Sequence, residues 1–255
     1  MEYAIVAVPA APVRRKARHQ TEMVSQLLFG EKVKILKEKG SLWVKVHSLH
    51  DGYEGWMTNT LLKEIPEKDA KRMDEFVTTD IFNKVLINGK KMHIPFGSTL
   101  AGFANGQGKL GDLDYSYDGN HANRSSIQPD AGKVLQLTAQ WLNAPYMWGG
   151  RTIFGVDCSG FVQVNYKMMG IDLSRDAWQQ AQQGWRVKKL KEAVCGDLAF
   201  FDDKDEIVHV GILLDSNQII HSSGKVRIDE IDKKGIIRAD TGIRTHFLRS
   251  IKRYW

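Results

Sequence analysis

One stretch of sequence decides how the second half of the chain folds: residues 157–170, DCSGFVQVNYKMMG. Asp157 is a favourable N-cap residue, and Gly170 is a common helix terminator. Between them the apolar side chains recur at helical spacing, at Cys158, Phe161, Val162, Tyr166 and Met169. The stretch therefore predicts an amphipathic helix whose first turn carries a cysteine.

The place of Cys158 at the start of this helix indicates chemistry. The helix dipole and the free amide hydrogens of a first turn favour the thiolate, which is the reactive form of cysteine. Gly149, Gly150 and Gly155 surround the start of the helix and permit close approach of a substrate. An arbitrary cysteine is more often a small buried hydrophobe, but this context favours a nucleophile.

A base for that nucleophile is predicted in residues 207–212, IVHVGI. Alternation along a strand would place Val208 and Val210 on the core face and His209 on the opposite face. His221 follows on the next predicted strand, where it would orient the His209 imidazole. Cys158, His209 and His221 are thus predicted to act together. Three N/S ligands also suit a catalytic zinc site, so a metal centre remains the alternative.

The organisation of the chain changes along its length. Residues 1–65 hold short apolar runs with glycine turns, which predicts a small β-barrel with strands at 33–36, 43–46 and 55–57. Residues 71–129 predict a second small β unit, with strands at 84–87 and 91–94 around the turn Asn88-Gly89. The Gly-, Asp- and Asn-rich residues 104–123 predict loop. A charged segment at 64–69 predicts the boundary between the two units.

Residues 130–255 form the third predicted domain. Helices are expected at 131–142 and 176–183 as well as at the cysteine, and strands at 197–201, 207–214 and 219–221. That mixture predicts an α+β domain.

Composition restricts the class of protein. The chain has 255 residues, 42% hydrophobic and 26% charged, which is typical of a soluble protein with two or three domains. No apolar run approaches the roughly 18 residues that a spanning helix needs. Two cysteines are too few for a disulfide scaffold. The net charge of +6 favours anionic ligands, but no base-reading motif accompanies it, so neither a nucleic-acid nor a membrane partner is expected.

The N-terminal residues bear on location. Glu2 lies where a signal peptide carries positive charge, and the apolar run that follows is short. If Met1 is the native start, we expect a cytoplasmic protein; if a leader has been removed, we expect a periplasmic or exported one.

Several separated motifs resemble those of the NlpC/P60 cell-wall peptidases. They are PYMWGG at 145–150, DCSGFV at 157–162, GDLAFF at 196–201, HVGI at 209–212 and IH at 220–221. The resemblance implies a papain-like α+β catalytic domain, in which a helix bearing the cysteine packs on an antiparallel sheet. It also implies that two small SH3-like β-barrels precede this domain, the first more clearly than the second.

The resemblance implies roles for further residues. Tyr146 would help stabilise the oxyanion, and Ser159 and Trp148 would contact substrate. In relatives an aspartate shortly after the catalytic helix binds a free amino group, and Asp176 occupies that place. Tyr53 and Glu22 of the first barrel are the candidates for closing the end of the pocket.

Two further expectations follow from the family's pattern. Cys195 stands where the family usually has proline, and we expect a buried structural thiol there. Neither a cofactor nor a metal is expected.

The implied activity is that of a γ-D-glutamyl-L-diamino acid endopeptidase. Its substrate would be a free murein stem peptide with an unblocked L-Ala, cleaved during cell-wall recycling by a monomer. Both meso-diaminopimelate and L-lysine stay open for the third stem residue. Hydrolysis of intact peptidoglycan, a wall-binding module without activity, and a thiol acyltransferase are the alternatives.

Overall fold

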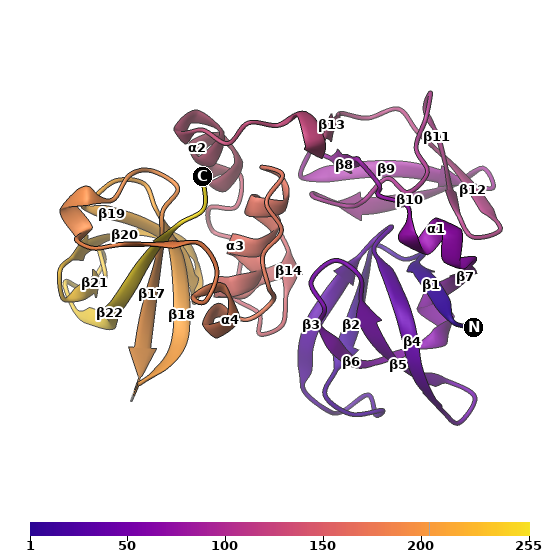
Figure 1. Ribbon diagram of the computed structural model, residues 1–255, viewed down its shortest axis with the longest axis horizontal. Coiled ribbons are helices and arrows are strands. Elements are labelled where there is room, and N and C mark those ends of the chain that lie inside the picture. The colour runs from indigo at the N-terminus through magenta and orange to yellow at the C-terminus, as the bar shows by residue number, and fades with distance from the viewer. Residues whose placement is uncertain (204) are drawn as a thin grey trace. The chain divides into compact units, whose positions relative to one another are not determined.

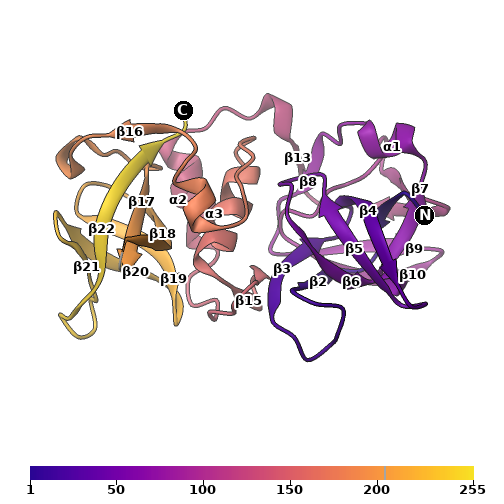
Figure 2. The ribbon, with the colours of Figure 1, turned by 60° about the horizontal axis from the view of Figure 1, so that its bottom comes forward.

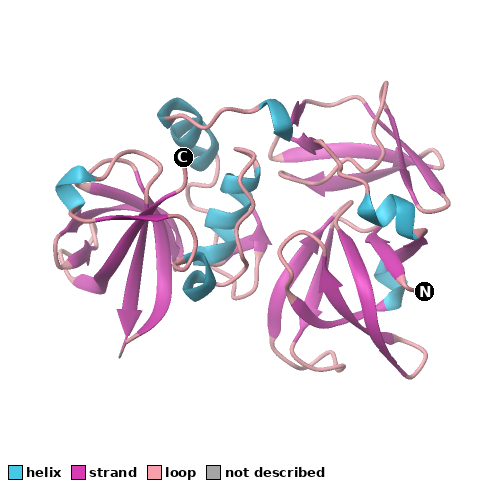
Figure 3. Cartoon of the chain, viewed as in Figure 1, coloured by secondary structure: helices cyan, strands magenta, loops and turns pink. Residues whose placement is uncertain are grey.

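The computed structural model describes residues 1–203 and 205–255. The chain divides into two compact units (Figure 1). The first unit comprises Met1–Ile127 and Arg151–Ile153, and the second comprises Gln128–Gly150 and Phe154–Trp255. Strands make up most of the regular structure in both units (Figure 3). Within these described residues, no helix is long and apolar enough to cross a bilayer.

The first unit begins with a seven-stranded antiparallel sheet in the order β3-β2-β6-β5-β4-β1-β7. Its elements are β1 (Tyr3–Val6), β2 (Ala10–Arg14), β3 (Met23–Leu28), β4 (Lys32–Lys39), β5 (Trp43–Ser48), β6 (Glu54–Thr58), the 3-10 helix η1 (Asn59–Leu61) and β7 (Leu62–Ile65). Burial alternates along β5, where Val44 and Val46 are buried. The three strands predicted in this region are confirmed.

A second group of strands follows α1 (Glu67–Lys71). A four-stranded sheet has the order β10-β9-β12-β11, and β13 pairs with β8. The elements are β8 (Phe76–Thr78), β9 (Phe82–Ile87), β10 (Lys90–Pro95), β11 (Gln107–Leu110), β12 (Leu113–Tyr117), β13 (His121–Asn123) and the 3-10 helix η2 (Arg124–Ser126). Asn88 and Gly89 both have positive φ, at 49° and 73°, as the predicted hairpin turn requires.

The prediction of loop for residues 104–123 is wrong, because β11, β12 and β13 lie there. Gly108 lies directly across from Tyr115 in the ladder, and a Cβ on Gly108 would come within 2.2 Å of the Tyr115 ring. The glycine therefore lets an aromatic ring pack over the strand, instead of marking a turn.

The two groups of strands share one hydrophobic core. Tyr3, Phe29 and Ile65 from the first group cluster with Val85 and Tyr115 from the second. Across the predicted boundary at 64–69 the chain continues as β7 and then α1. The two groups therefore pack together within the first unit.

The second unit is built on another seven-stranded antiparallel sheet, in the order β16-β22-β17-β18-β19-β20-β21 (Figure 2). Because β21 pairs with β22 as well as with β20, six of these strands close into a ring. The strands of this sheet are β16 (Trp185–Val187), β17 (Leu198–Asp203), β18 (Glu206–Leu213), β19 (Gln218–Ser223), β20 (Lys225–Asp232), β21 (Gly235–Ile237) and β22 (Arg244–Arg253). The short strand β15 (Gly155–Val156) is not part of it, and β14 (Arg151–Thr152) belongs to the first unit.

Helices accompany this sheet at the positions predicted, though two are shorter. They are α2 (Ala131–Ala139), α3 (Cys158–Lys167) and α4 (Ala177–Gln180); the 3-10 helix η3 (Leu190–Glu192) was not predicted. α3 is buried along its whole length and so lacks the polar face of an amphipathic helix. Its polar side chains are accommodated by hydrogen bonds: Gln163 donates to the Leu173 carbonyl at 3.0 Å, and Asn165 to the Phe161 carbonyl at 2.8 Å.

Candidate active site

Cys158 is the first residue of α3, as predicted. Asp157 is the N-cap and accepts a hydrogen bond from the Gly160 amide at 2.7 Å. The thiol is buried, and the backbone amides of Ser159 and Val210 donate hydrogen bonds to it. Since Val210 directly follows His209 in β18, the sulfur lies beside the strand that carries the predicted base.

The two predicted histidines are in direct contact. His209 Nε2 lies 2.8 Å from His221 Nδ1, and His221 Nε2 lies 3.0 Å from Asp229 Oδ2. Because the two imidazoles hydrogen-bond to each other, they do not converge on a shared metal position. Within residues 1–203 and 205–255, no three His, Cys, Asp or Glu side chains are grouped to hold a metal ion.

The predicted orientation of His209 needs correction. Val208 was expected on the core face, yet it is 50% exposed, whereas His209 is 5% exposed. His209 lies across from Phe201 and Ile207 across from Asp202, so Val208 is an extra residue in β18. This bulge interrupts the alternation and turns the imidazole inward.

Sequence reasoning missed three residues around the histidines. Asp229 and Arg227 lie on β20, where Arg227 is the ladder partner of His221 and its Nη2 donates to Asp229 Oδ1 at 2.8 Å. His246 of β22 stacks on His209, with ring centroids 4.2 Å apart and planes inclined by 24°. The alternating Arg227 and Asp229 were a usable signal, but the approach of β22 was not visible in the sequence.

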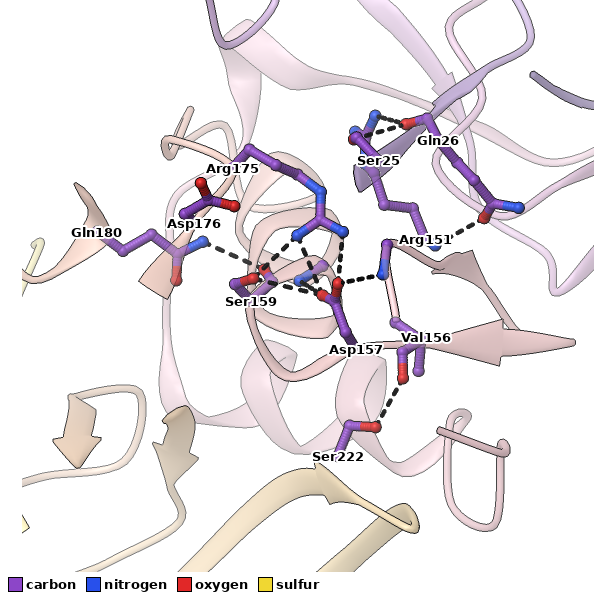
Figure 4. A network of polar contacts seen from close by, with 12 residues as sticks. Ser25, Gln26, Arg151, Val156, Asp157, Ser159, Arg175, Asp176, Gln180 and Ser222 are labelled. Carbon is purple, nitrogen blue, oxygen red and sulfur yellow. Dashed lines mark hydrogen bonds and ion pairs between the residues drawn. The ribbon is translucent and has the colours of Figure 1, made fainter. Parts of the chain in front are cut away.

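A fourth missed residue, Arg175, holds the start of α3. Its guanidinium is buried and donates to both oxygens of Asp157, at 2.6 and 3.1 Å, and to Ser159 Oγ at 2.9 Å (Figure 4). The Gly149 amide donates to the same Asp157 carboxylate at 2.8 Å. Asp157 thus ties the preceding loop and Arg175 to the turn that carries the nucleophile.

The residues predicted to contact substrate differ in setting. Ser159 is buried, and its hydroxyl accepts the hydrogen bond from Arg175. Trp148 is 58% exposed. Asp176 is half-buried as the N-cap of α4, and its amide donates to Gln179 Oε1 at 3.1 Å in a capping box. Their roles toward substrate stay predictions.

Tyr146 lies near enough to the nucleophile to sense its charge. Burial and the charges of Cys158 and Asp157 raise the pKa of the Tyr146 phenol above its ordinary value. The phenol therefore stays protonated at neutral pH and is able to donate a hydrogen bond, which an oxyanion requires.

Two of the remaining predicted residues belong to the first unit, and a third, Cys195, precedes β17 in the second. Tyr53 and Glu22 belong to the first unit, where Glu22 pairs with Arg15 at 2.6 Å, and their role at the pocket stays a prediction. Cys195 was expected to be buried, but it is partly exposed, and its sulfur lies 3.8 Å from the Ala131 carbonyl. The correction arises because the segment before β17 lies at the surface, with Val194 51% exposed.

Comparison with known proteins fits this geometry. Residues 143–245 match the NlpC/P60 family, and residues 13–62 match the bacterial dipeptidyl-peptidase Sh3 domain. Over 217 residues the chain is 32% identical to the γ-D-glutamyl-L-lysine dipeptidyl-peptidase of Bacillus subtilis (strain 168), an alignment that covers 78% of this chain and 71% of the relative. The chain belongs to the NlpC/P60 family.

Further relatives of this NlpC/P60 protein extend the match. The γ-D-glutamyl-L-lysine dipeptidyl-peptidase of Bacillus cereus (strain ATCC 10987 / NRS 248) is 28% identical, over 88% of this chain and 75% of the relative. The crystal structure of an NlpC/P60 family protein from Bacillus cereus ATCC 10987 covers 99% of both chains with a TM-score of 0.81 at 23% identity. The protein is thus a peptidoglycan-related peptidase with the NlpC/P60 fold, and it includes an SH3 domain of the dipeptidyl-peptidase type. The barrel form of both N-terminal groups of strands stays a prediction.

The protonation states of this NlpC/P60 site follow from burial. Burial raises the pKa of the Cys158 thiol to about 12, and the amides of Ser159 and Val210 only partly offset it. Burial lowers the pKa of His209 well below its ordinary value. The resting pair is therefore a neutral thiol and a neutral imidazole, in contrast to the thiolate expected from the helix dipole alone.

A pH dependence follows from these shifts. His209 accepts a proton only when neutral, and its folded-state pKa lies below the ordinary 6.5. Burial also lowers the pKa values of the neighbouring His221 and His246, that of His246 to about 4. As the pH falls through 6.5 the base stays neutral, and activity is lost only when the pH falls through the lowered pKa. We expect the acid limb of kcat/KM to have its midpoint below 6.5, measured over the pH range in which circular dichroism shows a folded protein. A midpoint at or above 6.5 would contradict the assignment.

Proposed function

We propose that this NlpC/P60 protein hydrolyses the amide bond between γ-D-Glu and the diamino acid in free cell-wall stem peptides whose N-terminal L-Ala is unblocked, as in murein peptide recycling. One observation carries the chemistry: a buried thiol at a helix N-terminus contacts the strand of a histidine that a second histidine and a carboxylate orient. The choice of bond is supported by the names of the two Bacillus relatives.

The first half of the reaction forms a thioester. The Cys158 sulfur attacks the γ-carbonyl carbon of D-Glu while the thiol proton passes to His209. The Tyr146 phenol and the amides at the start of α3 stabilise the negative charge on the carbonyl oxygen. His209 then gives its proton to the nitrogen of the diamino acid as the C–N bond breaks.

The second half releases the dipeptide. With the amine gone, a water molecule attacks the thioester carbon, and neutral His209 takes its proton. The C–S bond breaks, L-Ala-γ-D-Glu leaves as the free acid, and the proton returns to the Cys158 sulfur. The thiol and the imidazole are then neutral again.

Asp176 is our candidate for the group that binds the free amine of L-Ala. It lies between two anchors to the first turn of α3: the preceding residue, Arg175, binds Asp157, and Gln180 Nε2 donates to the Ser159 carbonyl at 3.1 Å. These contacts hold the start of α4 at a defined place relative to the thiol. A carboxylate in a fixed, half-buried position suits an ammonium group, whose desolvation would otherwise be unfavourable.

The test uses free and N-acetylated L-Ala-γ-D-Glu peptides that end in either L-Lys or meso-diaminopimelate. For the wild type we expect mass spectrometry to show release of L-Ala-γ-D-Glu from the free-amine peptides alone. For Asp176→Asn we expect kcat/KM on the free-amine peptide to fall about 10- to 100-fold, the effect of losing one charged hydrogen bond.

The matched control is Asp172→Asn, which removes the same charge from an exposed position four residues earlier in the chain. It should leave kcat/KM close to that of the wild type. Equal cleavage of free and acetylated peptides would exclude the amine pocket and leave intact peptidoglycan as a substrate. Cleavage of none of the peptides would refute the proposed activity.

A further inference from the structure

We propose that Asp229 is a positioning residue that fixes the tautomers of both histidines, so that the unprotonated Nδ1 of His209 is the atom that takes the Cys158 proton. The inference rests on the cysteine-peptidase mechanism proposed above. It assigns a role to a buried carboxylate that does not itself touch the nucleophile.

The Asp229 carboxylate is surrounded by donors. Oδ1 accepts from Arg227 Nη2 at 2.8 Å and from the Ala239 amide at 2.9 Å. Oδ2 lies 2.7 Å from Arg227 Nε and 3.0 Å from His221 Nε2. Although burial opposes ionisation, hydrogen bonds from His221 and Arg227 hold the pKa of Asp229 below its ordinary value. An ionised carboxylate only accepts hydrogen bonds, so the proton between it and His221 must reside on His221 Nε2.

The position of this proton determines where the proton between His221 and His209 lies. Burial lowers the pKa of His221 even though Asp229 opposes the shift, so the imidazole is neutral at neutral pH. A neutral imidazole with a proton on Nε2 has a bare Nδ1. His221 Nδ1 therefore accepts, and His209 Nε2, at 2.8 Å, must donate to it.

The same reasoning applies to His209. Its pKa is lowered by burial and by the neighbouring histidines, so it too is neutral, with its proton on Nε2. Its Nδ1 is then bare and able to receive a proton. If the carboxylate were replaced by a group that donates to His221 Nε2, each bond in the chain would reverse, and the proton on His209 would move to Nδ1. In that tautomer the base is blocked.

Asp229 also acts on the charged state of the site. When His209 takes the thiol proton, the positive charge is shared along a chain that ends at the Asp229 carboxylate. Two of its other neighbours supply no anion: His246 stacks on the His209 ring, and Phe201 lies across from His209 in β17. Arg227 is engaged by Asp240 at 3.1 Å as well as by Asp229. Loss of the Asp229 charge should therefore lower the pKa of the histidine pair and slow acylation together.

The direct test requires no substrate. In protein labelled with 15N-histidine, two-dimensional 15N–1H spectra distinguish bare from protonated ring nitrogens, and His209→Gln and His221→Gln variants assign the signals. We expect wild-type His209 and His221 to show protonated Nε2 and bare Nδ1 near neutral pH. A wild-type spectrum with protonated Nδ1 on His209 would overturn the inference, whatever the enzyme cleaves.

The variant Asp229→Asn tests the consequence, because its amide is able to donate to His221 Nε2. We expect protonated Nδ1 to appear on His209, kcat to fall about 10- to 100-fold, and the acid limb of kcat/KM to move to lower pH. The matched control is Asp240→Asn, which removes a carboxylate from the same arginine without contacting His221. It should change neither the tautomers nor the acid limb. Equal effects of the two variants would indicate that Asp229 has only a structural role. A loss of activity in Asp229→Asn that is the same at every pH, with unchanged tautomers, would indicate the same.

If neither the wild type nor the variants cleave the stem peptides, the proposed function fails while the tautomer assignment still stands or falls on the spectra. The rate at which iodoacetamide alkylates Cys158 supplies a second measurement that needs no substrate. Asp229→Asn should slow this rate near neutral pH, because His209 no longer accepts the thiol proton. An unchanged rate would count against the inference.

Discussion

The variant Cys158→Ala should lose at least about 10⁴-fold in kcat/KM on the free-amine stem peptide, because no other group at the site can form the thioester. The fold should persist. Alanine keeps the backbone of the first turn of α3, and the Asp157 cap does not involve the sulfur. We expect the free energy of unfolding to change by about 1 kcal/mol. Progress curves followed by mass spectrometry, with circular dichroism on the same samples, check both parts.

The second cysteine supplies the control. Cys195 is partly exposed, and its sulfur lies 3.8 Å from the Ala131 carbonyl. Cys195→Ala should therefore retain nearly all the activity. Turnover by Cys158→Ala near the wild-type rate would refute Cys158 as the nucleophile. Loss of activity in Cys195→Ala alone would show that Cys195, and not Cys158, is the reactive thiol.

The variant Arg175→Met should have the largest effect on stability, about 3–5 kcal/mol. It keeps most of the side-chain volume but leaves Asp157, which is 6% exposed, without its cationic partner. The same carboxylate caps α3 and binds the Gly149 amide, so the turn that carries the nucleophile should loosen. Urea unfolding measures the loss, and hydrogen exchange of the α3 amides assigns it to the second unit.

A second arginine provides the comparison for this experiment. Arg249 is 56% exposed in its side chain and lies 3.6 Å from Asp202. Arg249→Met should cost no more than about 1 kcal/mol, as is usual for a surface ion pair. If the two variants lose similar amounts of stability, the buried bridge does not stabilise α3 in the way we infer.

Local patterns predicted the nucleophile and its helix well. Asp157 and Cys158 are adjacent in the sequence, and the cap depends only on the next few residues. His209 and His221 were found because they lie on neighbouring strands of one meander. Their partners were harder to identify: Arg175 lies 18 residues from Asp157, and His246 approaches from the far end of the chain. Such contacts depend on tertiary packing, which no local pattern encodes.

Two errors arose from rules that tertiary packing overrides. Strict alternation placed Val208 in the core, but Val208 is an extra residue in β18 and is exposed, whereas His209 and Val210 are both buried. Glycine-rich composition predicted loop where β11 packs a glycine under the Tyr115 ring. In both cases the neighbouring strand decided the outcome.

The hydrophobic core shared by the two N-terminal groups of strands limits how this part of the protein can be exchanged during evolution. Side chains such as Phe29 and Tyr115 contact edge to face across the two groups, with ring centroids 5.6 Å apart. A recombination event that brought in only residues 1–65 from another gene would replace Tyr3, Ile5, Phe29 and Ile65 and leave the remaining side chains of that core without their matched partners. The two groups should therefore be inherited as a single block, and an SH3 domain from a different enzyme should function here only if its companion strands come with it.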